Sequence, residues 1–296
     1  MTVTSSTLAS RAMGRELRRL RIAKGVGQSR AARAAEMSPQ SIGRLEEGQN
    51  TRITSFQINA LCDVYAASDD ERRVVLDLAR EARAAREGKT GWWRAYLDNF
   101  TENFNHYLAL EEAAAQITSW SLSTLPGLLQ TPEYRRAIAW AEAPNAPAEE
   151  IERRIEWAAK RQARLEDSDF RAEIYLSEGV LRSRVGGPGI MEDQSRHLAE
   201  VSEMPNVSIH VVPFDARSIV GLLAGPFTFI DFPPLPHSKA TEPPIVYVEG
   251  YAGDLYLERE EEIARYRQAL AEIRRVSLDK GKSREFILAV AREYGE

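Results

Sequence analysis

Several residue types and patterns are scarce or missing in this sequence. There is one cysteine, Cys62, so a single chain can form neither an internal disulfide nor a cysteine-based zinc cluster. The four histidines are scattered, without partner acids at metal-ligand spacing. No run of about 18 uncharged apolar residues occurs, and the first ten residues are polar. We therefore expect a cytoplasmic protein that neither spans nor crosses a membrane.

Sequence motifs typical of enzymes are missing as well. There is no Gly-x-Ser-x-Gly elbow and no glycine-rich phosphate loop that ends in Lys and Ser or Thr. The glycine-rich stretch Gly186–Gly189 lacks the lysine and the preceding strand of such a loop, so we interpret it as a plain connection. Acidic pairs such as Glu111 and Glu112 lie on predicted helices as solvated charge. We expect no catalytic activity, no cofactor and no metal.

The charge of the chain is unevenly distributed. The whole sequence has a formal net charge of −5, but residues 1–66 hold ten Lys and Arg against five acidic residues. That segment therefore carries +5, which leaves −10 for the rest. Since phosphate contacts dominate the affinity of proteins for DNA, any DNA contact is expected in the basic N-terminal segment.

Helical periodicity and capping signals divide the first 87 residues into five predicted helices. Apolar residues from Met13 recur at helical spacing up to a stop at Gly25, and a short alanine-rich helix follows over 28–35. Ser38 and Pro39 start a third helix that stops at Gly48. A capping box at Thr54 starts the fourth helix, and three acids from Asp69 start the fifth. The second and third predicted helices form a helix-turn-helix motif. In such a motif the later helix, here the third, enters the major groove of DNA.

The third predicted helix, Ser38–Glu47, has two different faces. Ile42 and Leu45 point toward a core, and the opposite face presents Gln40, Gly43 and Arg44. Glutamine can pair with adenine and arginine with guanine, and glycine permits close approach to the groove. At the start of the second helix, Gln28, Ser29 and Arg30 supply polar groups suited to phosphate. The alternative is that Gln40 and Arg44 are ordinary solvated residues of a surface helix.

This segment closely resembles the Xre/Cro family of helix-turn-helix repressors. The resemblance rests on Gly14–Arg21, Gln28 and Ser38–Gly48. It implies DNA contacts for a set of residues that match the family pattern: Gln28, Gln40, Ser41 and Arg44. It also implies a structural ion pair between Arg21 and Glu46.

The sequence departs from that family at two positions. Glu36 occupies a turn position where the family often has glycine, and Gly27 replaces the usual Ser or Thr cap of the second helix. Both departures concern the geometry of the turn and the cap. With Ser38 as the helix cap, the candidate DNA-binding residues are Gln28, Ser29, Arg30, Ser38, Gln40, Ser41, Gly43 and Arg44.

The rest of the chain reads as helices followed by alternating helices and strands. Helices are predicted over 102–117, 131–142, 148–166, 190–203, 258–276 and 283–294, and strands over 172–176, 207–213, 226–232, 245–249 and 254–257. The proline-rich stretch Pro233–Pro244 is predicted to be an exposed loop. The expected fold class is mainly α with a smaller α+β part. An all-α domain (1–68) and a helical connector (69–90) precede a domain of helices on a small antiparallel sheet (91–296).

This second region resembles the C-terminal domain of WhiJ-type actinobacterial regulators. The resemblance covers roughly residues 92–290 and rests on Trp92–Arg94, Leu110–Glu111, Leu125–Tyr134, Arg161–Gln162, Glu178, Pro205–Val207, Val212–Phe214 and Val246–Glu249. It implies an antitoxin-like regulatory module that binds a small partner protein of the BldB type, without a role for any single residue. We interpret Pro126, Gly127 and Tyr134 as a fold-defining turn and its packing aromatic.

Two functional hypotheses follow from these patterns. The first is a DNA-binding transcriptional regulator that acts as a homodimer on an inverted repeat, with a C-terminal domain that dimerises and binds a small protein. The second is a one-component sensor whose C-terminal domain encloses a small molecule. Its motivation is the aromatic content of the strand-rich region, namely Phe214, Phe227, Phe229, Tyr247, Tyr251 and Tyr256. Such aromatics also suit an ordinary sheet core.

Overall fold

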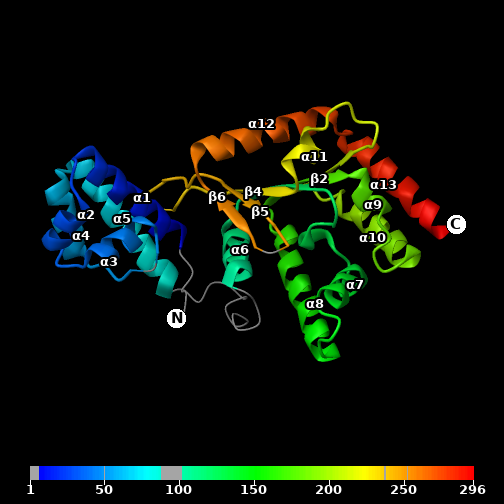
Figure 1. Cartoon of the computed structure of the whole chain (residues 1–296), viewed down its shortest axis with the longest axis horizontal. Coiled ribbons are helices and arrows are strands. Elements are labelled where there is room, and N and C mark those ends of the chain that lie inside the picture. The colour runs from blue at the N-terminus through cyan, green and yellow to red at the C-terminus, as the bar shows by residue number, and fades with distance from the viewer. Residues whose placement is uncertain (1–6, 50, 88–101, 237, 252) are drawn as a thin grey trace. The chain divides into compact units, whose positions relative to one another are not determined.

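The computed structural model describes residues 7–49, 51–87, 102–236, 238–251 and 253–296, and the chain divides into two compact units (Figure 1). Unit 1 comprises the chain up to Ala113 together with Phe232–Pro243, and unit 2 comprises Ala114–Asp231 and Pro244–Glu296. The Trp92–Arg94 motif and residues 88–90 of the predicted connector lie outside the described residues. Within the described ranges, no helix is both long and apolar enough to cross a membrane.

Unit 1 contains six helices in its described part. They are α1 (Leu8–Ala23), α2 (Gln28–Ala34), α3 (Pro39–Glu46), α4 (Ser55–Tyr65), α5 (Asp69–Glu87) and α6 (Glu102–Ala113). The predicted capping box is present, because Thr54 Oγ1 accepts from the Gln57 amide while the Gln57 side chain accepts from the Thr54 amide. All five helices predicted over the first 87 residues are present, as α1 to α5.

One apolar core holds the first five helices together. Leu17, Ile42, Leu61 and Leu78, from α1, α3, α4 and α5, are fully buried members of it. Cys62 is buried in the same core, and this burial raises the pKa of its thiol. Since residues of α5 belong to this core, the helix predicted as a connector is packed into unit 1.

Unit 2 is built on a six-stranded mixed sheet. Its strands are β1 (Gln116–Ser121), β2 (Arg171–Ser177), β3 (Val207–Val212), β4 (Phe227–Asp231), β5 (Ile245–Val248) and β6 (Leu255–Leu257), in the order β3-β2-β1-β4-β5-β6. β1 to β3 pair in parallel, and β1, β4, β5 and β6 pair antiparallel. The expectation of an antiparallel sheet thus holds for three of the five strand pairings and is wrong for the other two, β1 with β2 and β2 with β3. Parallel neighbours need crossover connections, and helices of unit 2 supply them.

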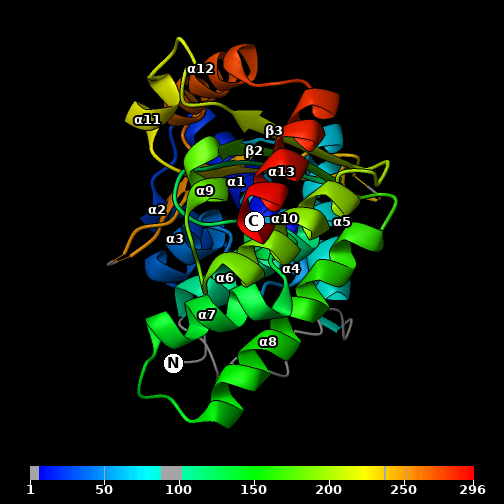
Figure 2. The ribbon, with the colours of Figure 1, turned by 90° about the vertical axis from the view of Figure 1, so that its right-hand side faces the viewer.

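The helices of unit 2 form these crossovers and cover the sheet. η2 (Gly127–Leu129), α7 (Pro132–Glu142), α8 (Ala148–Gln162) and η3 (Ala163–Glu166) join β1 to β2, and α9 (Glu178–Arg182) and α10 (Pro188–Val201) join β2 to β3. α11 (Val220–Ala224) precedes β4, and α12 (Glu260–Val276) and α13 (Lys280–Gly295) end the chain. α12 lies on one side of the sheet and α7 and α8 on the other, and α10 and α13 lie side by side (Figures 1 and 2).

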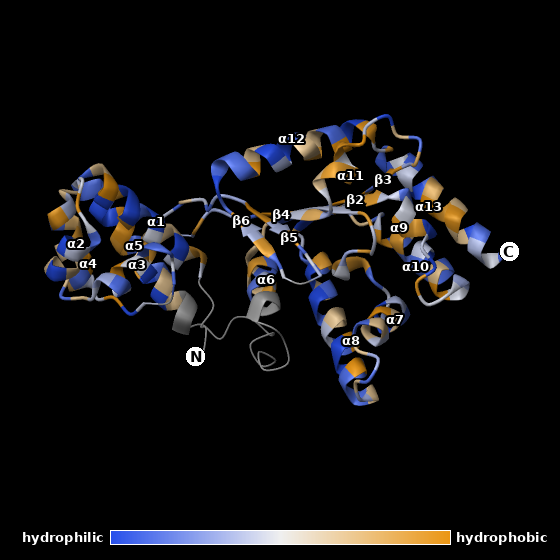
Figure 3. Ribbon diagram, in the orientation of Figure 1, coloured by the Kyte–Doolittle hydropathy of each residue, from blue (hydrophilic) through white to orange (hydrophobic). Residues whose placement is uncertain are grey.

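The face of the sheet toward α12 has an aromatic core. Trp120, Tyr175 and Phe227 come from three adjacent strands and are buried there. They belong to one apolar cluster with Ile263 and Leu270 of α12. α8 and α13 carry hydrophobic and hydrophilic residues on different sides, as amphipathic helices do (Figure 3). α13 packs against β3 and against α10, so it covers the sheet at its β3 end.

The segment Leu125–Tyr134 is a structural turn whose polar groups are satisfied from inside the fold. Tyr134 is fully buried, and its hydroxyl accepts a hydrogen bond from the Leu125 amide (3.2 Å). Gln162 donates to the carbonyls of Gly127 (3.1 Å) and Gln130 (2.5 Å), and Gln194 donates to the Leu129 carbonyl (2.8 Å). These contacts confirm the interpretation of the turn as fold-defining.

The proline-rich stretch Pro233–Pro244 is an irregular loop, as predicted, but it is not exposed throughout. Leu235 and Glu242 are buried in unit 1, and Leu235 belongs to the core formed by α1 to α5. The burial of these two side chains was missed, because proline and polar residues indicate a loop but do not tell whether other parts of the chain cover it.

Candidate DNA interface

The start of α3 is fixed by its own sequence. Ser38 caps the helix, since its Oγ accepts a hydrogen bond from the Ser41 amide (3.1 Å), and Pro39 occupies the first helical position. The hydroxyls of Ser38 and Ser41 lie 2.9 Å apart, and Arg44 Nη2 approaches the Ser41 hydroxyl at 3.5 Å. A row of polar groups therefore runs along the first two turns of α3.

The two faces of α3 differ in exposure as the sequence predicted. Ile42 and Leu45 are buried in the core of unit 1. Gln40 and Arg44 are exposed, and Gly43 lies half-buried between them. This exposed face is hydrophilic and has a side-chain-free position at its centre, so a groove edge could approach it closely.

α2 contributes a second polar edge next to α3. Its cap residue, Gly27, makes no side-chain cap hydrogen bond, and Gln28, Ser29 and Arg30 are exposed. Gln28 also has a partner inside the unit, because its Nε2 donates to Glu46 Oε2 (3.1 Å). A methyl group at Gly43 would lie 3.8 Å from Gln28 Nε2. Gln28 thus lies beside the exposed face of α3 and is held there by Glu46.

An ion pair between Arg21 and Glu46 joins α1 to the end of α3. Arg21 donates from Nε to Glu46 Oε1 (2.5 Å) and from Nη2 to Oε2 (2.9 Å), and its Nη1 donates to the Val26 carbonyl (2.9 Å). The glutamate is buried, and these hydrogen bonds raise the pKa of Arg21. The structural role that the family resemblance implied for this pair is confirmed.

The turn between α2 and α3 contains a strained residue. Glu36 has a φ of 52°, in the left-handed region that favours glycine. This is the position at which the sequence departs from the glycine of similar proteins. The turn nevertheless closes, with the Met37 amide donating to the Ala32 carbonyl (2.9 Å).

We expect Glu36→Gly to stabilise the protein by roughly 0.5–1 kcal/mol, because relief of the left-handed strain exceeds the entropy that glycine loses on folding. Thermal unfolding followed by circular dichroism measures this change. Ala66→Gly is a matched control, since Ala66 ends α4 with a φ of 53° and should respond in the same direction. A lower melting temperature for Glu36→Gly alongside a higher one for Ala66→Gly would contradict this account of the turn.

The aromatic residues of unit 2 that could have lined a small-molecule site are not gathered in one place. Phe227 and Phe229 lie in the core under α12, where Phe227 packs edge-on against Tyr266 with ring centroids 5.0 Å apart. Phe214 and Tyr251 are exposed, and Tyr247 contacts Tyr256. The structure therefore uses the strand aromatics chiefly as core.

The sequence reasoning missed one group of residues at the other end of α1. Arg11 and Arg15 pair with Glu242, a residue more than 200 positions later. No short-range signal in the sequence could have paired them, because charge and helical spacing report only on residues close in the chain.

Comparison with known proteins agrees with a chain that joins an N-terminal helix-turn-helix to a separate C-terminal domain. A family model described as a helix-turn-helix domain matches residues 12–75, which contain α2, α3 and the predicted DNA-binding residues. A second, described as a domain of unknown function (DUF5753), matches residues 104–289. No curated protein and no solved structure matches the chain. The matched helix-turn-helix makes this protein a DNA-binding regulator.

Proposed function

The chain belongs to the DUF5753 family, here joined to a helix-turn-helix domain, and on that basis we propose that it regulates transcription by reading an inverted repeat through α3. The observation that carries the proposal is the division of α3 into a buried face with Ile42 and Leu45 and an exposed face with Gln40 and Arg44. Because its proposed target is genomic DNA, we expect it to act in the cytoplasm. We further expect it to act by binding alone, without catalysis.

We assign base reading and phosphate contact to different residues. Gln40 and Arg44 have side chains that can each pair with one base edge, and Gly43 between them permits close approach. Ser38 and Ser41 lie at the entry of the same helix, where their hydroxyls suit backbone contacts. Ser29 and Arg30 at the start of α2 suit phosphate, and Gln28 links this edge to α3 through Glu46.

We further propose that two copies act together and that unit 2 receives a small partner protein. One recognition helix reads about four or five base pairs, too few to specify a genomic site, so two half-sites are needed. Unit 2 has an apolar surface that suits protein contacts, since Ile219, Leu222 and Leu223 at α11 are 63%, 65% and 78% exposed. The resemblance to WhiJ-type regulators supports a small partner of the BldB type.

To test base reading, DNA retained by the purified protein is sequenced to identify its site, and variants are then titrated with that duplex and with random DNA. We expect Arg44→Ala and Gln40→Ala each to cost about 1–3 kcal/mol on the specific duplex and to change random binding little. Arg30→Ala should weaken both and lower the salt dependence by about one unit of slope.

Two controls complete this test. Arg153→Ala, which removes the same charge from an exposed position on α8 of unit 2, should change neither binding mode. A duplex with one half of the repeat scrambled should bind the protein more weakly than the intact repeat, because only one of the two recognition helices then meets its half-site. An unchanged ratio of specific to random affinity in Arg44→Ala would overturn the assignment of α3 as the reading helix.

A further inference from the structure

A strap from late in the chain completes the DNA-binding unit. The strap, Phe232–Pro243, connects β4 to β5, yet it belongs to unit 1, whereas the two strands belong to unit 2. Its own backbone is turned, with the Leu235 amide donating to the Ala240 carbonyl (2.9 Å) and the Lys239 amide to the Leu235 carbonyl (3.0 Å). It is therefore a structured part of the unit that reads DNA.

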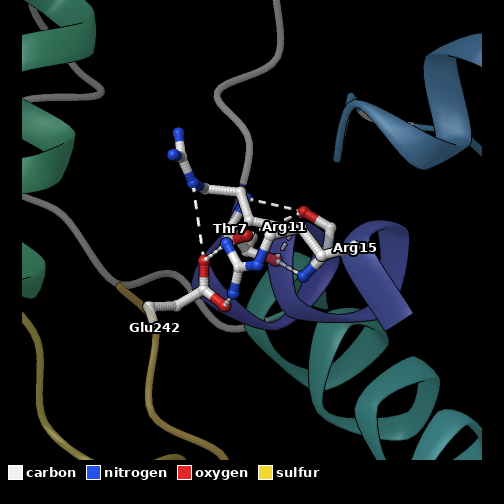
Figure 4. Close-up of polar contacts among 5 residues, drawn as sticks. Thr7, Arg11, Arg15 and Glu242 are labelled. Carbon is white, nitrogen blue, oxygen red and sulfur yellow. Dashed lines mark hydrogen bonds and ion pairs between the residues drawn. The ribbon is translucent and has the colours of Figure 1, made fainter. Parts of the chain in front are cut away.

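The strap binds α1 through a buried carboxylate. Glu242, whose side chain is 1% exposed, accepts a hydrogen bond from Arg15 Nη1 (2.8 Å) and a second from Arg15 Nη2, and lies 3.7 Å from Arg11 Nε (Figure 4). Such a bidentate pair is geometrically specific. Because a carboxylate buried away from water is costly without a counter-charge, removal of one partner of such a pair is strongly destabilising. Losing Glu242 would remove the carboxylate that these two arginines of α1 share.

Two further contacts fix the strap. Leu235 is buried in the apolar core of α1 to α5, with Ala240 packed beside it. The Ser238 amide donates to Glu81 Oε1 (2.9 Å), and Glu81 is a buried residue of α5. The strap thus contacts both α1 and α5, the two helices that pack along each other in unit 1.

The face of α1 that holds the strap also holds the recognition helix. Gly14 packs against the end of α3, where a Cβ would lie 2.3 Å from the Leu45 carbonyl oxygen. A Cβ at Gly48, which follows α3, would lie 2.7 Å from Arg11 Cα. Residues 11, 14 and 15 are neighbours on one face of α1. The strap and the recognition helix therefore both pack against this face.

We propose that the docked strap holds α1 against α3, and that its withdrawal lowers DNA affinity, so that this connection between β4 and β5 controls the reading helix. This regulation rests on the proposed DNA-reading function. The change in DNA affinity that this proposal predicts for loss of Glu242 is opposite to the change expected from charge alone. Removing the negative charge of Glu242 would by itself strengthen binding to phosphate, whereas loss of the strap's support weakens it.

The test uses the full chain with Glu242→Gln. We expect the amides of α1 and α3 to exchange hydrogen at least about tenfold faster, with those of α10 and α13 unchanged, because a broken buried pair frees a local unit. Affinity for the identified duplex should fall about tenfold. The matched control is Glu203→Gln, which breaks the exposed pair with Arg284 in unit 2 and should leave both readouts at their original values.

Two more variants separate the effect of charge from the effect of docking. Glu242→Asp keeps the charge but shortens the side chain, so it weakens the pair without the electrostatic gain in DNA affinity. Leu235→Ala removes the apolar anchor without altering charge, and both variants should speed exchange and weaken binding. Unchanged exchange in all three variants, or tighter DNA binding by Glu242→Gln, would overturn the proposal. If the original chain binds no duplex, the proposed function fails, while the exchange experiment still decides whether the strap supports α3.

Discussion

Replacement of Glu46 by glutamine is expected to destabilise unit 1 by about 3–5 kcal/mol, the cost of breaking a buried ion pair by removing one partner. Glu46 accepts hydrogen bonds from Arg21 and from Gln28, so its loss leaves a guanidinium without this counter-charge and loosens the edge of α2. Urea unfolding followed by helical circular dichroism measures the loss.

Glu47 provides the matched control for this change. It is the next residue in the chain, is exposed, and accepts a hydrogen bond from the exposed side chain of Gln49 (2.9 Å). We expect Glu47→Gln to change stability by no more than about 0.5 kcal/mol. Adding Arg21→Gln to Glu46→Gln should recover part of the loss, since the orphaned charge is then gone. Equal stability of the Glu46 and Glu47 variants would show that the pair contributes little.

The elements of unit 1 could be predicted because their signals are local. The signals for α3 all lie within eleven adjacent positions: the cap at Ser38, the stop at Gly48, and the spacing of Ile42 and Leu45 between them. The helix and its exposed face therefore follow from residues close together in the chain. The Arg21–Glu46 pair is different, because 25 positions separate its partners. It was predicted only through the resemblance to a known family.

Unit 2 was predicted less well where local signals conflict. β1 was not predicted: its first two residues were placed in the helix 102–117 and the other four in no element. Its sequence, Gln-Ile-Thr-Ser-Trp-Ser, lacks clean alternation, and five of its six residues are buried. A strand at the centre of a sheet has both faces covered, so its polar residues do not mark a solvent side. Ser119 and Thr118 are buried for this reason.

The strap shows a second limit of sequence reasoning. Its prolines correctly indicate irregular backbone, but its burial depends on contacts with α1 and α5 that span 227 and 157 positions of the chain. Periodicity carries no information on such pairings. The domain boundaries drawn along the sequence therefore could not include a segment that returns to unit 1 after four strands of unit 2.

Glycines 14 and 43 should respond in opposite ways to the same added methyl group. At Gly14 the new Cβ would lie 2.3 Å from the Leu45 carbonyl oxygen and 2.9 Å from that of Glu46, and these are backbone atoms that cannot swing aside. We expect Gly14→Ala to destabilise unit 1 by about 3 kcal/mol, as overpacking against fixed atoms does, in spite of the better helix propensity of alanine. Thermal unfolding of the full chain measures this loss.

At Gly43 the added Cβ would meet only the Gln28 side chain, at 3.8 Å or more. Gly43→Ala is therefore expected to stabilise the protein by about 0.5–1 kcal/mol, the helix-propensity gain of alanine over glycine. If α3 lies in the major groove, the same methyl group meets the DNA, so specific affinity should fall while stability rises. Folding and binding changes of opposite sign in Gly43→Ala cannot arise from a damaged fold. A variant that is more stable and binds the specific duplex with full affinity would place the DNA on another face of the unit.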